Sequence, residues 1–441
     1  MDSTALTPAQ DQTDASARDR QEPGFEGPSI LSRDSPLMDS TGKPIQFGMF
    51  VKFSGVYDSG LTPVFAIGQQ TPLVAQAGFG VEASFGAAFS RRWRRAKLRV
   101  EYRGAYRRYA TASLLNGLDQ FFQLAYSRVL QRHLVLDLKT TLGTTTLANG
   151  AFTYLPISSL DLLGLPTNEL FDNRTNYMES RADLTWQKTE RLSFGFGGDG
   201  FVVRRQSLLL AGLDGYSARA SVAYRLTSRQ TISASYNNTY FDYQRAFGNS
   251  RLQIPALGYS ASLARHWDLS TQAGAARVGT LGLTQVALDP AIAALIGQSS
   301  ATVTFSRVSY LPVAEARLVR GFKTSSLTVD YAMGVAPGNG YYLTSRQTSA
   351  AIGYSYIAGK TWEIRGNVAF NQLSALGQAL GTYSNEQTGA EVFYNLTRAT
   401  HLDVRYDYRH YTTENVILQK DSNRVSLGLA FSLGDLFESV R

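Results

Sequence analysis

The chain of 441 residues contains no cysteine, which excludes a disulfide framework, a thiol nucleophile and a cysteine-ligated metal site. A sequence without cysteine suits a cell envelope, where free thiols are oxidised. Tryptophan (4), histidine (4) and proline (13) are also scarce. No run of about 18 apolar residues occurs, so the sequence predicts no membrane-spanning helix.

The N-terminal segment lacks a basic stretch followed by an apolar stretch, so no signal peptide is visible. Residues 1–44 are polar and rich in turn formers, without hydrophobic periodicity. We expect a disordered or loosely docked extension there, and binding of a periplasmic partner is an open alternative. Residues 435–441 are expected to form a short C-terminal tail.

Groups that could carry out catalysis are few and scattered. Three of the four histidines, His133, His266 and His401, lie in or beside short connections, and His410 is expected on the outer face near the rim. None accompanies a serine nucleophile and a carboxylate in a recognisable arrangement, and no pair has metal-ligand spacing. The sequence therefore predicts no enzyme, no cofactor and no metal site.

What the chain does contain is a repeated alternation, seen clearly in HLDVRYDYRHYTT (residues 401–413). One face of this segment is apolar and rich in tyrosine: Leu402, Val404, Tyr406 and Tyr408. The other face alternates in charge: Asp403, Arg405, Asp407 and Arg409. About eighteen segments from residue 46 onward share this period of two, which predicts strands with two different faces.

The connections between these segments are alternately short and long. Short ones include QKTER after Trp186 and LTSRQ after Tyr224, whereas 57–77, 147–174 and 279–301 are long. This alternation predicts an up-and-down antiparallel meander with its tight turns at one end. The four tryptophans lie in or beside short turns, as expected for a girdle at a membrane interface: Trp93, Trp186, Trp267 and Trp362. We expect tyrosines at the other strand ends to form the opposite girdle, Tyr177 and Tyr411 among them.

The length of the segments decides between architectures. They are longer than the five or six residues that are usual in soluble sheets. An open sheet of this many strands would leave exposed edges, and closing it into a barrel removes them. We therefore predict an all-β, transmembrane, up-and-down antiparallel β-barrel over residues 45–434, with about 18 strands and 16 as the alternative.

In this alternation, and in its short turns and long loops, the sequence resembles the bacterial outer-membrane β-barrel superfamily over residues 46–434. Within it the sequence is similar to the large porin-like barrels. The resemblance implies a bacterial outer-membrane location in contact with lipid. It also implies that loop 147–174, with the charges Asp161, Glu169 and Asp172, enters the lumen as a constriction. A loop folded over the outer rim is the alternative.

The net charge of +8 raises the question of a nucleic-acid partner. We predict none, because many basic residues lie at the short turns, where lipid headgroups are expected. A second charged set projects into the lumen by its position in the alternation. Its pore-lining members are Arg99, Glu101, Arg103, Arg181 and Arg365, together with Asp403, Arg405, Asp407 and Arg409. Such a wall would serve a hydrated pore, or cross-strand ion pairs that stiffen the barrel, or both.

The sequence thus favours a porin-like channel for diffusion of small hydrophilic solutes. Two alternatives stay open. One is an exporter of a polysaccharide, since the chain resembles in outline the eighteen-stranded, arginine-lined glycan exporters. The other is a structural or adhesive barrel without an open pore. A homo-oligomer also stays open, with the small side chains of 257–264 as one candidate surface.

Overall fold

The computed structural model describes residues 45–61, 76–111, 115–146, 173–264, 266–287, 299–359, 361–376, 381–397, 399–414 and 418–434. The predicted extension 1–44 and tail 435–441 lie outside these residues. No helix of the described residues is long and apolar enough to cross a membrane.

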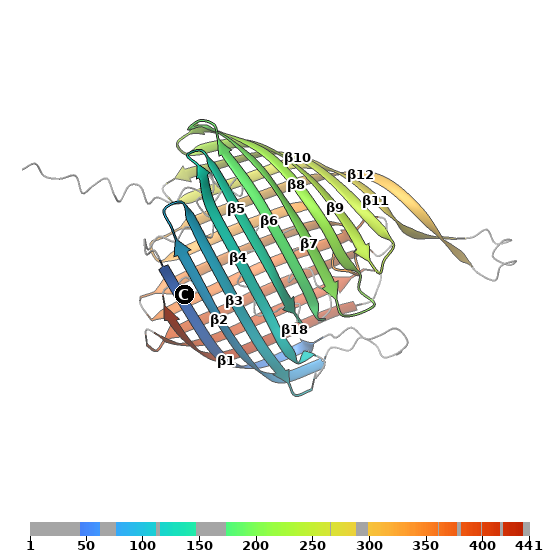
Figure 1. Cartoon of the computed structure of the whole chain (residues 1–441). Coiled ribbons are helices and arrows are strands. Elements are labelled where there is room, and N and C mark those ends of the chain that lie inside the picture. Colours follow the sequence, from blue (N-terminus) through green and yellow to red (C-terminus); the bar gives the residue numbers. More distant parts are fainter. Residues whose placement is uncertain are drawn as a thin grey trace, which may run out of the picture.

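Eighteen antiparallel strands make up the described chain (Figure 1). The first nine are β1 (Ile45–Leu61), β2 (Gln76–Arg92), β3 (Ala96–Tyr109), β4 (Gly117–Gln131), β5 (Leu134–Thr145), β6 (Thr175–Gln187), β7 (Leu192–Arg205), β8 (Gly212–Thr227) and β9 (Gln230–Gln244). The other nine are β10 (Gly248–Ala264), β11 (Trp267–Ala287), β12 (Ser300–Gly321), β13 (Ser325–Ala336), β14 (Ser345–Ala358), β15 (Trp362–Ala375), β16 (Thr382–Asn395), β17 (Thr400–Thr413) and β18 (Leu418–Gly434).

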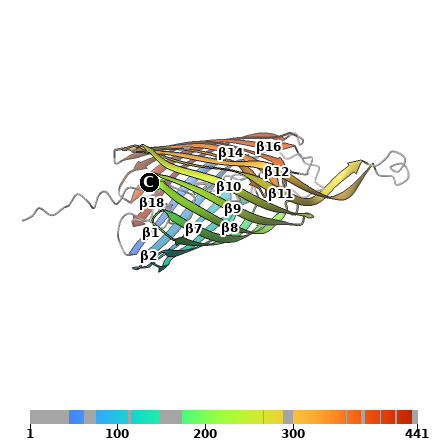
Figure 2. The same cartoon turned by 90° about the horizontal axis from the view of Figure 1, so that it is seen from above.

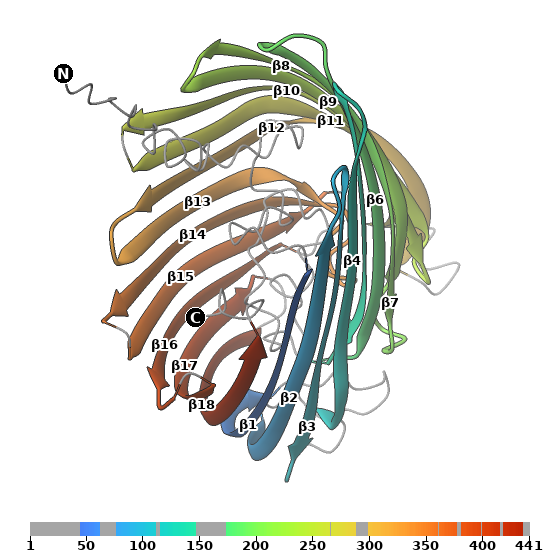
Figure 3. The ribbon, with the colours of Figure 1, turned by 60° about the vertical axis from the view of Figure 1, so that its left-hand side comes forward.

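The sheet closes into a barrel. Each strand pairs with the next along the chain, and β1 also pairs with β18, with Gly48 opposite Gly434 and Asp58 opposite Arg424. The view in Figure 3 places β13–β18 on the wall that faces β2–β6. The prediction of an eighteen-stranded up-and-down barrel is therefore confirmed, and the sixteen-stranded alternative is wrong.

The two faces of each strand differ as the alternation predicts. On β1 the outward side chains are apolar and exposed, as for Phe47 (49% exposed) and Phe53 (65%). The neighbouring residues Gln46 and Ser54 face inward and are buried. With every strand paired to a neighbour on both sides around the ring and an apolar exterior, the barrel satisfies the demands of a bilayer core. The chain has the architecture of a large, porin-like outer-membrane barrel.

The two ends of the barrel are unlike. Short turns join each even-numbered strand from β2 to β16 to the next strand, and all of them lie at one end of the barrel. This end, here called the turn end, corresponds to the periplasmic side of outer-membrane barrels. The opposite end, the loop end, has the longer connections. Two connections at the loop end are as short as the turns and depart from the predicted pattern: residues 245–247 join β9 to β10, and residues 414–417 join β17 to β18.

Strands β11 and β12 extend beyond the rim at the loop end. They pair with each other from Trp267 opposite Arg320 to Ala287 opposite Ser300. Strand β12 pairs with β13 only over Ala314–Gly321. Strand β11 pairs with β10 up to Gly282, which lies opposite Phe305. Beyond these two residues β11 and β12 form a two-stranded ribbon that projects from the barrel (Figures 1 and 2).

Candidate functional site

Lumen-facing charges form ion pairs along the wall made by β15–β18 and β1–β8. The guanidinium of Arg99 lies 3.0 Å from Glu101, and Arg103 also contacts that carboxylate. The other pairs are Arg181–Asp183 (2.5 Å), Arg219–Asp199 (2.8 Å), Arg365–Glu363 (2.7 Å) and Arg405–Asp407 (2.6 Å). Five of the predicted pore-lining arginines thus have a carboxylate partner on the same wall: Arg99, Arg103, Arg181, Arg365 and Arg405.

The strand register also places opposite charges side by side. Glu391 of β16 lies opposite Arg365 on one neighbouring strand and Arg405 on the other. Likewise, Arg424 of β18 lies between Asp407 of β17 and Asp58 of β1. Opposite charges at such cross-strand positions attract. The first row has one excess positive charge and the second has one excess negative charge, so these two neighbouring rows compensate each other.

A pair between non-adjacent strands crosses β18. Lys52 Nζ of β1 reaches Asp403 Oδ2 of β17 at 2.5 Å. Gly428 of β18 lies opposite both Asp403 and Ser54. A Cβ at Gly428 would stand 2.5 Å from Asp403 Oδ1 and 2.8 Å from Lys52 Cε. The absence of a side chain at this position is therefore what lets the pair form.

A buried ion cluster, made of Glu82, Arg107, Asp119 and Arg424, lies where β18, β2, β3 and β4 meet. Arg107 is 1% exposed, and its Nε donates to Glu82 Oε2 at 2.6 Å while its Nη1 donates to Asp119. Arg424 donates to the same Glu82 oxygen at 3.1 Å. Two guanidinium groups thus balance two carboxylates, as burial of charges requires.

The wall formed by β9–β11 has a different chemistry. Its inward positions between the mouth and the turns carry hydroxyl and amide groups: Thr231, Ser233, Ser235, Asn237, Ser260, Ser262, Ser270 and Gln272. Gln272 Nε2 donates to Ser235 Oγ at 3.0 Å across these strands. The lumen therefore has an ion-paired wall and a wall rich in hydroxyl and amide groups. This second wall also holds the carboxylate of Asp268, which accepts a hydrogen bond from Ser262 Oγ at 2.8 Å.

At the loop end, the segment Pro337–Thr344 between β13 and β14 is docked inside the barrel. Tyr243 of β9 donates its hydroxyl to the Pro337 carbonyl at 3.3 Å or to Thr344 Oγ1 at 2.8 Å. Ser250 of β10 also contacts Thr344 Oγ1, at 2.5 Å. The Ala211 amide, between β7 and β8, donates to the Gly340 carbonyl at 3.0 Å. These strands are several places away around the ring, so the segment occupies part of the mouth.

Apolar side chains hold this segment on both sides. On one side is the mouth cluster: Phe201, Val203, Leu213, Phe241, Tyr243, Leu252, Ala276, Val278 and Val335. On the other, Tyr342 packs against Leu373, Tyr383 and Tyr411 of β15, β16 and β17. Tyr342 is fully buried, so its removal from this site would expose a large aromatic surface.

The prediction that Tyr177 and Tyr411 belong to the outer girdle is wrong. Tyr411 is 2% exposed in the cluster with Tyr342, and Tyr177 packs against the mouth cluster. Both share the face of the inward charges on their strands, and the count of alternate positions places them in the lumen. Arg409 lies beside Tyr411 and donates to Asn385 Oδ1 at 2.9 Å and to the Tyr383 hydroxyl at 3.1 Å.

The segment 337–344 was missed at the level of sequence, where loop 147–174 was favoured as the constriction. Asp161, Glu169 and Asp172 lie outside the described residues. The sequence does contain a sign of this segment, the stretch APGNGYYL, in which turn formers are followed by two tyrosines and a leucine. Turn formers predict the loop, but its inward direction depends on partners from β7–β10 that only the closed ring brings near.

The four tryptophans all lie at the turn end, as expected. Trp93, Trp186 and Trp362 are more than 40% exposed. The Arg320 guanidinium lies 4.6 Å from the Trp267 ring centroid and 4.1 Å from that of Phe322. A half-exposed ring beside a cation suits the headgroup layer.

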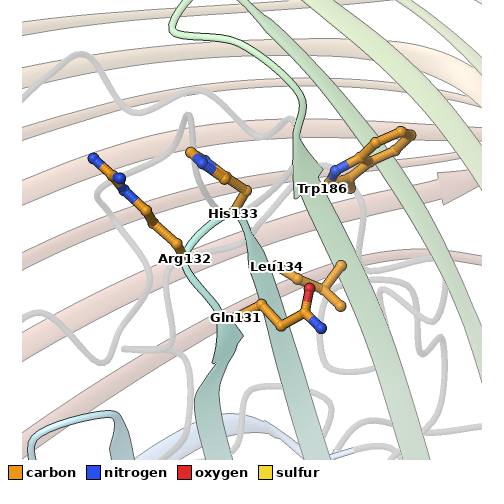
Figure 4. A pocket seen from close by; sticks show the side chains of 5 residues that line it. All are labelled: Gln131, Arg132, His133, Leu134 and Trp186. Carbon is orange, nitrogen blue, oxygen red and sulfur yellow. The ribbon is translucent and has the colours of Figure 1, made fainter.

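The turn end also carries a recess of about 390 Å³ lined by Gln131, Arg132, His133, Leu134 and Trp186. Figure 4 shows these side chains around the turn between β4 and β5 and at the end of β6. No carboxylate lines it. Among the described residues, no group of three or more His, Asp or Glu side chains is placed to hold a metal ion.

Comparison with known proteins finds likeness in fold. No protein-family model and no curated protein sequence matches the chain. Similar solved structures include OpdG of Pseudomonas aeruginosa, with TM-score 0.44 and 13% identity, covering 89% of this chain and 98% of that chain. OpdK of the same organism, solved with vanillate, has TM-score 0.44 and 11% identity, with 88% and 99% coverage. OccAB3 of Acinetobacter baumannii has TM-score 0.43 and 8% identity, with 89% and 99% coverage.

Proposed function

We propose that the protein is a channel of the bacterial outer membrane through which small hydrophilic solutes diffuse, and that it catalyses no reaction. The observation that carries the proposal is the two-sided lumen. An ion-paired wall faces a hydroxyl-rich wall inside a barrel whose outside is apolar. Such a lining hydrates readily and offers hydrogen bonds to a polar solute at every level.

We further propose that selectivity between anions and cations is weak. Arg99, Arg181, Arg365 and Arg405 each have a carboxylate at ion-pair distance, so little uncompensated charge faces the pathway. Uncharged polar solutes such as small sugars would lose water at modest cost and regain hydrogen bonds from serine and threonine side chains.

The narrow part of the pathway is proposed to lie at the loop end, where Pro337–Thr344 is docked. Loop 147–174, with Asp161, Glu169 and Asp172, remains our proposed second element of the constriction. Both elements would exclude large solutes while the wall below them stays wide.

The test is conductance and solute flux. The purified full chain, reconstituted in a planar bilayer, should give discrete conductance steps. In a liposome-swelling assay, monosaccharides should enter faster than disaccharides, and long oligosaccharides should not enter. Absence of conductance would favour the structural barrel, and passage of long chains would favour the polysaccharide exporter.

Deletion of 150–170 provides a second arm, because loss of a constriction should raise conductance. If the deleted chain folds and its conductance equals that of the intact chain, the 147–174 part of the proposal is wrong.

A further inference from the structure

Two arginines on the outside of the barrel lack the carboxylate partners that the arginines of the lumen have. Arg251 of β10 stands between Ser250 and Leu252, both fully buried, and Arg277 of β11 stands between the buried Ala276 and Val278. Since alternate residues of a strand point to opposite faces, both guanidinium groups project outward. Both side chains are exposed.

Each guanidinium has only a neutral partner. Arg251 Nε donates to Asn238 Oδ1 at 3.2 Å, and Arg277 Nη1 donates to Gln253 Oε1 at 3.3 Å. In the described part of the chain, neither has a carboxylate at ion-pair distance. The nearest outward carboxylate in the register is that of Asp242 on β9. Arg251 lies opposite Tyr240, and Asp242 is the next outward residue of β9 toward the loop end. Two positive charges therefore stay uncompensated on a surface that faces lipid.

The register brings the two arginines together around a glycine. Asn238, Gln253, Arg277 and Tyr310 form one row across β9–β12. The next outward row consists of Tyr240, Arg251, Gly279 and Val308. Gly279 thus lies beside Arg251 and one outward position beyond Arg277. A Cβ there would have only the Arg251 carbonyl oxygen within 4.0 Å, so the position is an open notch beside the two arginines.

The height of this notch matches the outer headgroup level. Trp267 marks the turn-end interface on the same strand, ten residues before Arg277. At about 3.3 Å per residue and a tilt of about 40°, the two lie about 25 Å apart along the membrane normal. That separation equals the apolar band of an outer-membrane barrel, about 25 Å tall. The outward residues between them are Leu269, Thr271, Ala273 and Ala275, none of which is charged.

We propose that Arg251, Arg277 and the notch at Gly279 form a binding site for the phosphate of a phosphorylated glycolipid in the outer leaflet. Guanidinium groups bind phosphate through paired, charge-assisted hydrogen bonds. Tyr310, which is 73% exposed, and Tyr240, whose ring centroid lies 5.5 Å from that of Tyr216, would flank the headgroup. The site rests on the proposed membrane orientation and is independent of whether the lumen conducts.

The test measures binding of bis-phosphorylated lipid A to the purified full chain by native mass spectrometry. Arg251→Gln and Arg277→Gln should each weaken binding about tenfold or more, because each removes a charge-assisted contact. The double variant should retain no specific adduct. Dephosphorylated lipid A should bind the wild-type chain as weakly as the double variant binds the intact lipid.

Arg204→Gln is the matched control. Arg204 also points outward near the loop end, but it already pairs with Asp214 at 2.5 Å and 3.1 Å. The control should leave lipid binding unchanged. Binding that is equal in the wild type and the double variant overturns the proposal, as does a loss in Arg204→Gln equal to that in Arg277→Gln.

Competition with inorganic phosphate distinguishes a site for a lipid phosphate from a site for free phosphate. Millimolar phosphate should leave the lipid bound, because the acyl chains on the apolar band add to the affinity of the lipid. Full displacement of the lipid by inorganic phosphate would instead identify a site for free phosphate and would contradict the lipid assignment.

Discussion

At position 428 the lumen wall requires a residue without a side chain. Gly428→Ala places a methyl group within 3.0 Å of Asp403 and Lys52, so the pair between them must separate or the strands must shift. We expect a loss of about 1–3 kcal/mol in the free energy of unfolding, measured by urea unfolding in lipid vesicles. Gly353→Ala is the control, since a Cβ there meets nothing within 4 Å and should cost much less.

Arg107 and Arg405 both belong to ion pairs of the lumen, but their burial differs. Arg107→Gln leaves Glu82 and Asp119 as buried carboxylates, with Arg424 the one remaining cation of the cluster. We expect a cost of about 3–5 kcal/mol. Arg405→Gln opens a pair whose side chains are 18% and 19% exposed, and should cost about 1 kcal/mol or less. Equal costs in the same unfolding assay would contradict the assignment of Arg107 to a buried cluster.

At the scale of single elements, the docked segment Pro337–Thr344 depends on Gly338. Its φ is +74°, and a Cβ would lie 1.9 Å from the Tyr342 carbonyl oxygen. Gly338→Ala should therefore release the segment from the mouth and raise single-channel conductance. Gly359→Ala is matched, because Gly359 also has a positive φ, +68°, but has open space around it. A Gly338→Ala channel identical to the wild type would show that the segment does not limit the pathway.

The strands were predictable from the sequence because the period of two is local. In 401–413 the inward positions Asp403, Arg405, Asp407 and Arg409 follow from counting alternate residues. The partners of these charges do not follow in the same way. Lys52 lies 351 residues before Asp403 and meets it only after β1 pairs with β18.

The same limit explains the tyrosines and the docked segment. A tyrosine near a strand end can lie in a headgroup layer or in an apolar cluster, and the residue type alone does not decide between the two. Tyr411 belongs to the second because Tyr342, from the loop between β13 and β14, covers it. Contacts between this loop and strands remote in sequence depend on the closed ring, so neither segment alone reveals them.

At the scale of the whole molecule, closure was predictable from strand length and number, because an open sheet of this size would leave exposed edges. What the sequence left open was how the lumen charges are arranged. The structure shows most of them paired on the wall formed by β15–β18 and β1–β8, with a further pair between Arg317 of β12 and Asp330 of β13 at 3.5 Å. The wall formed by β9–β11 carries mainly hydroxyl and amide groups. A channel with such a lining should discriminate little between small cations and anions.

The central claim is best tested by single-channel recording of the full chain in a planar bilayer under a KCl gradient. The account predicts discrete conductance steps and a reversal potential close to zero, because the lumen charges compensate one another. A membrane that stays silent with folded protein inserted, or a reversal potential close to that of a purely cation- or anion-selective pore, would contradict it.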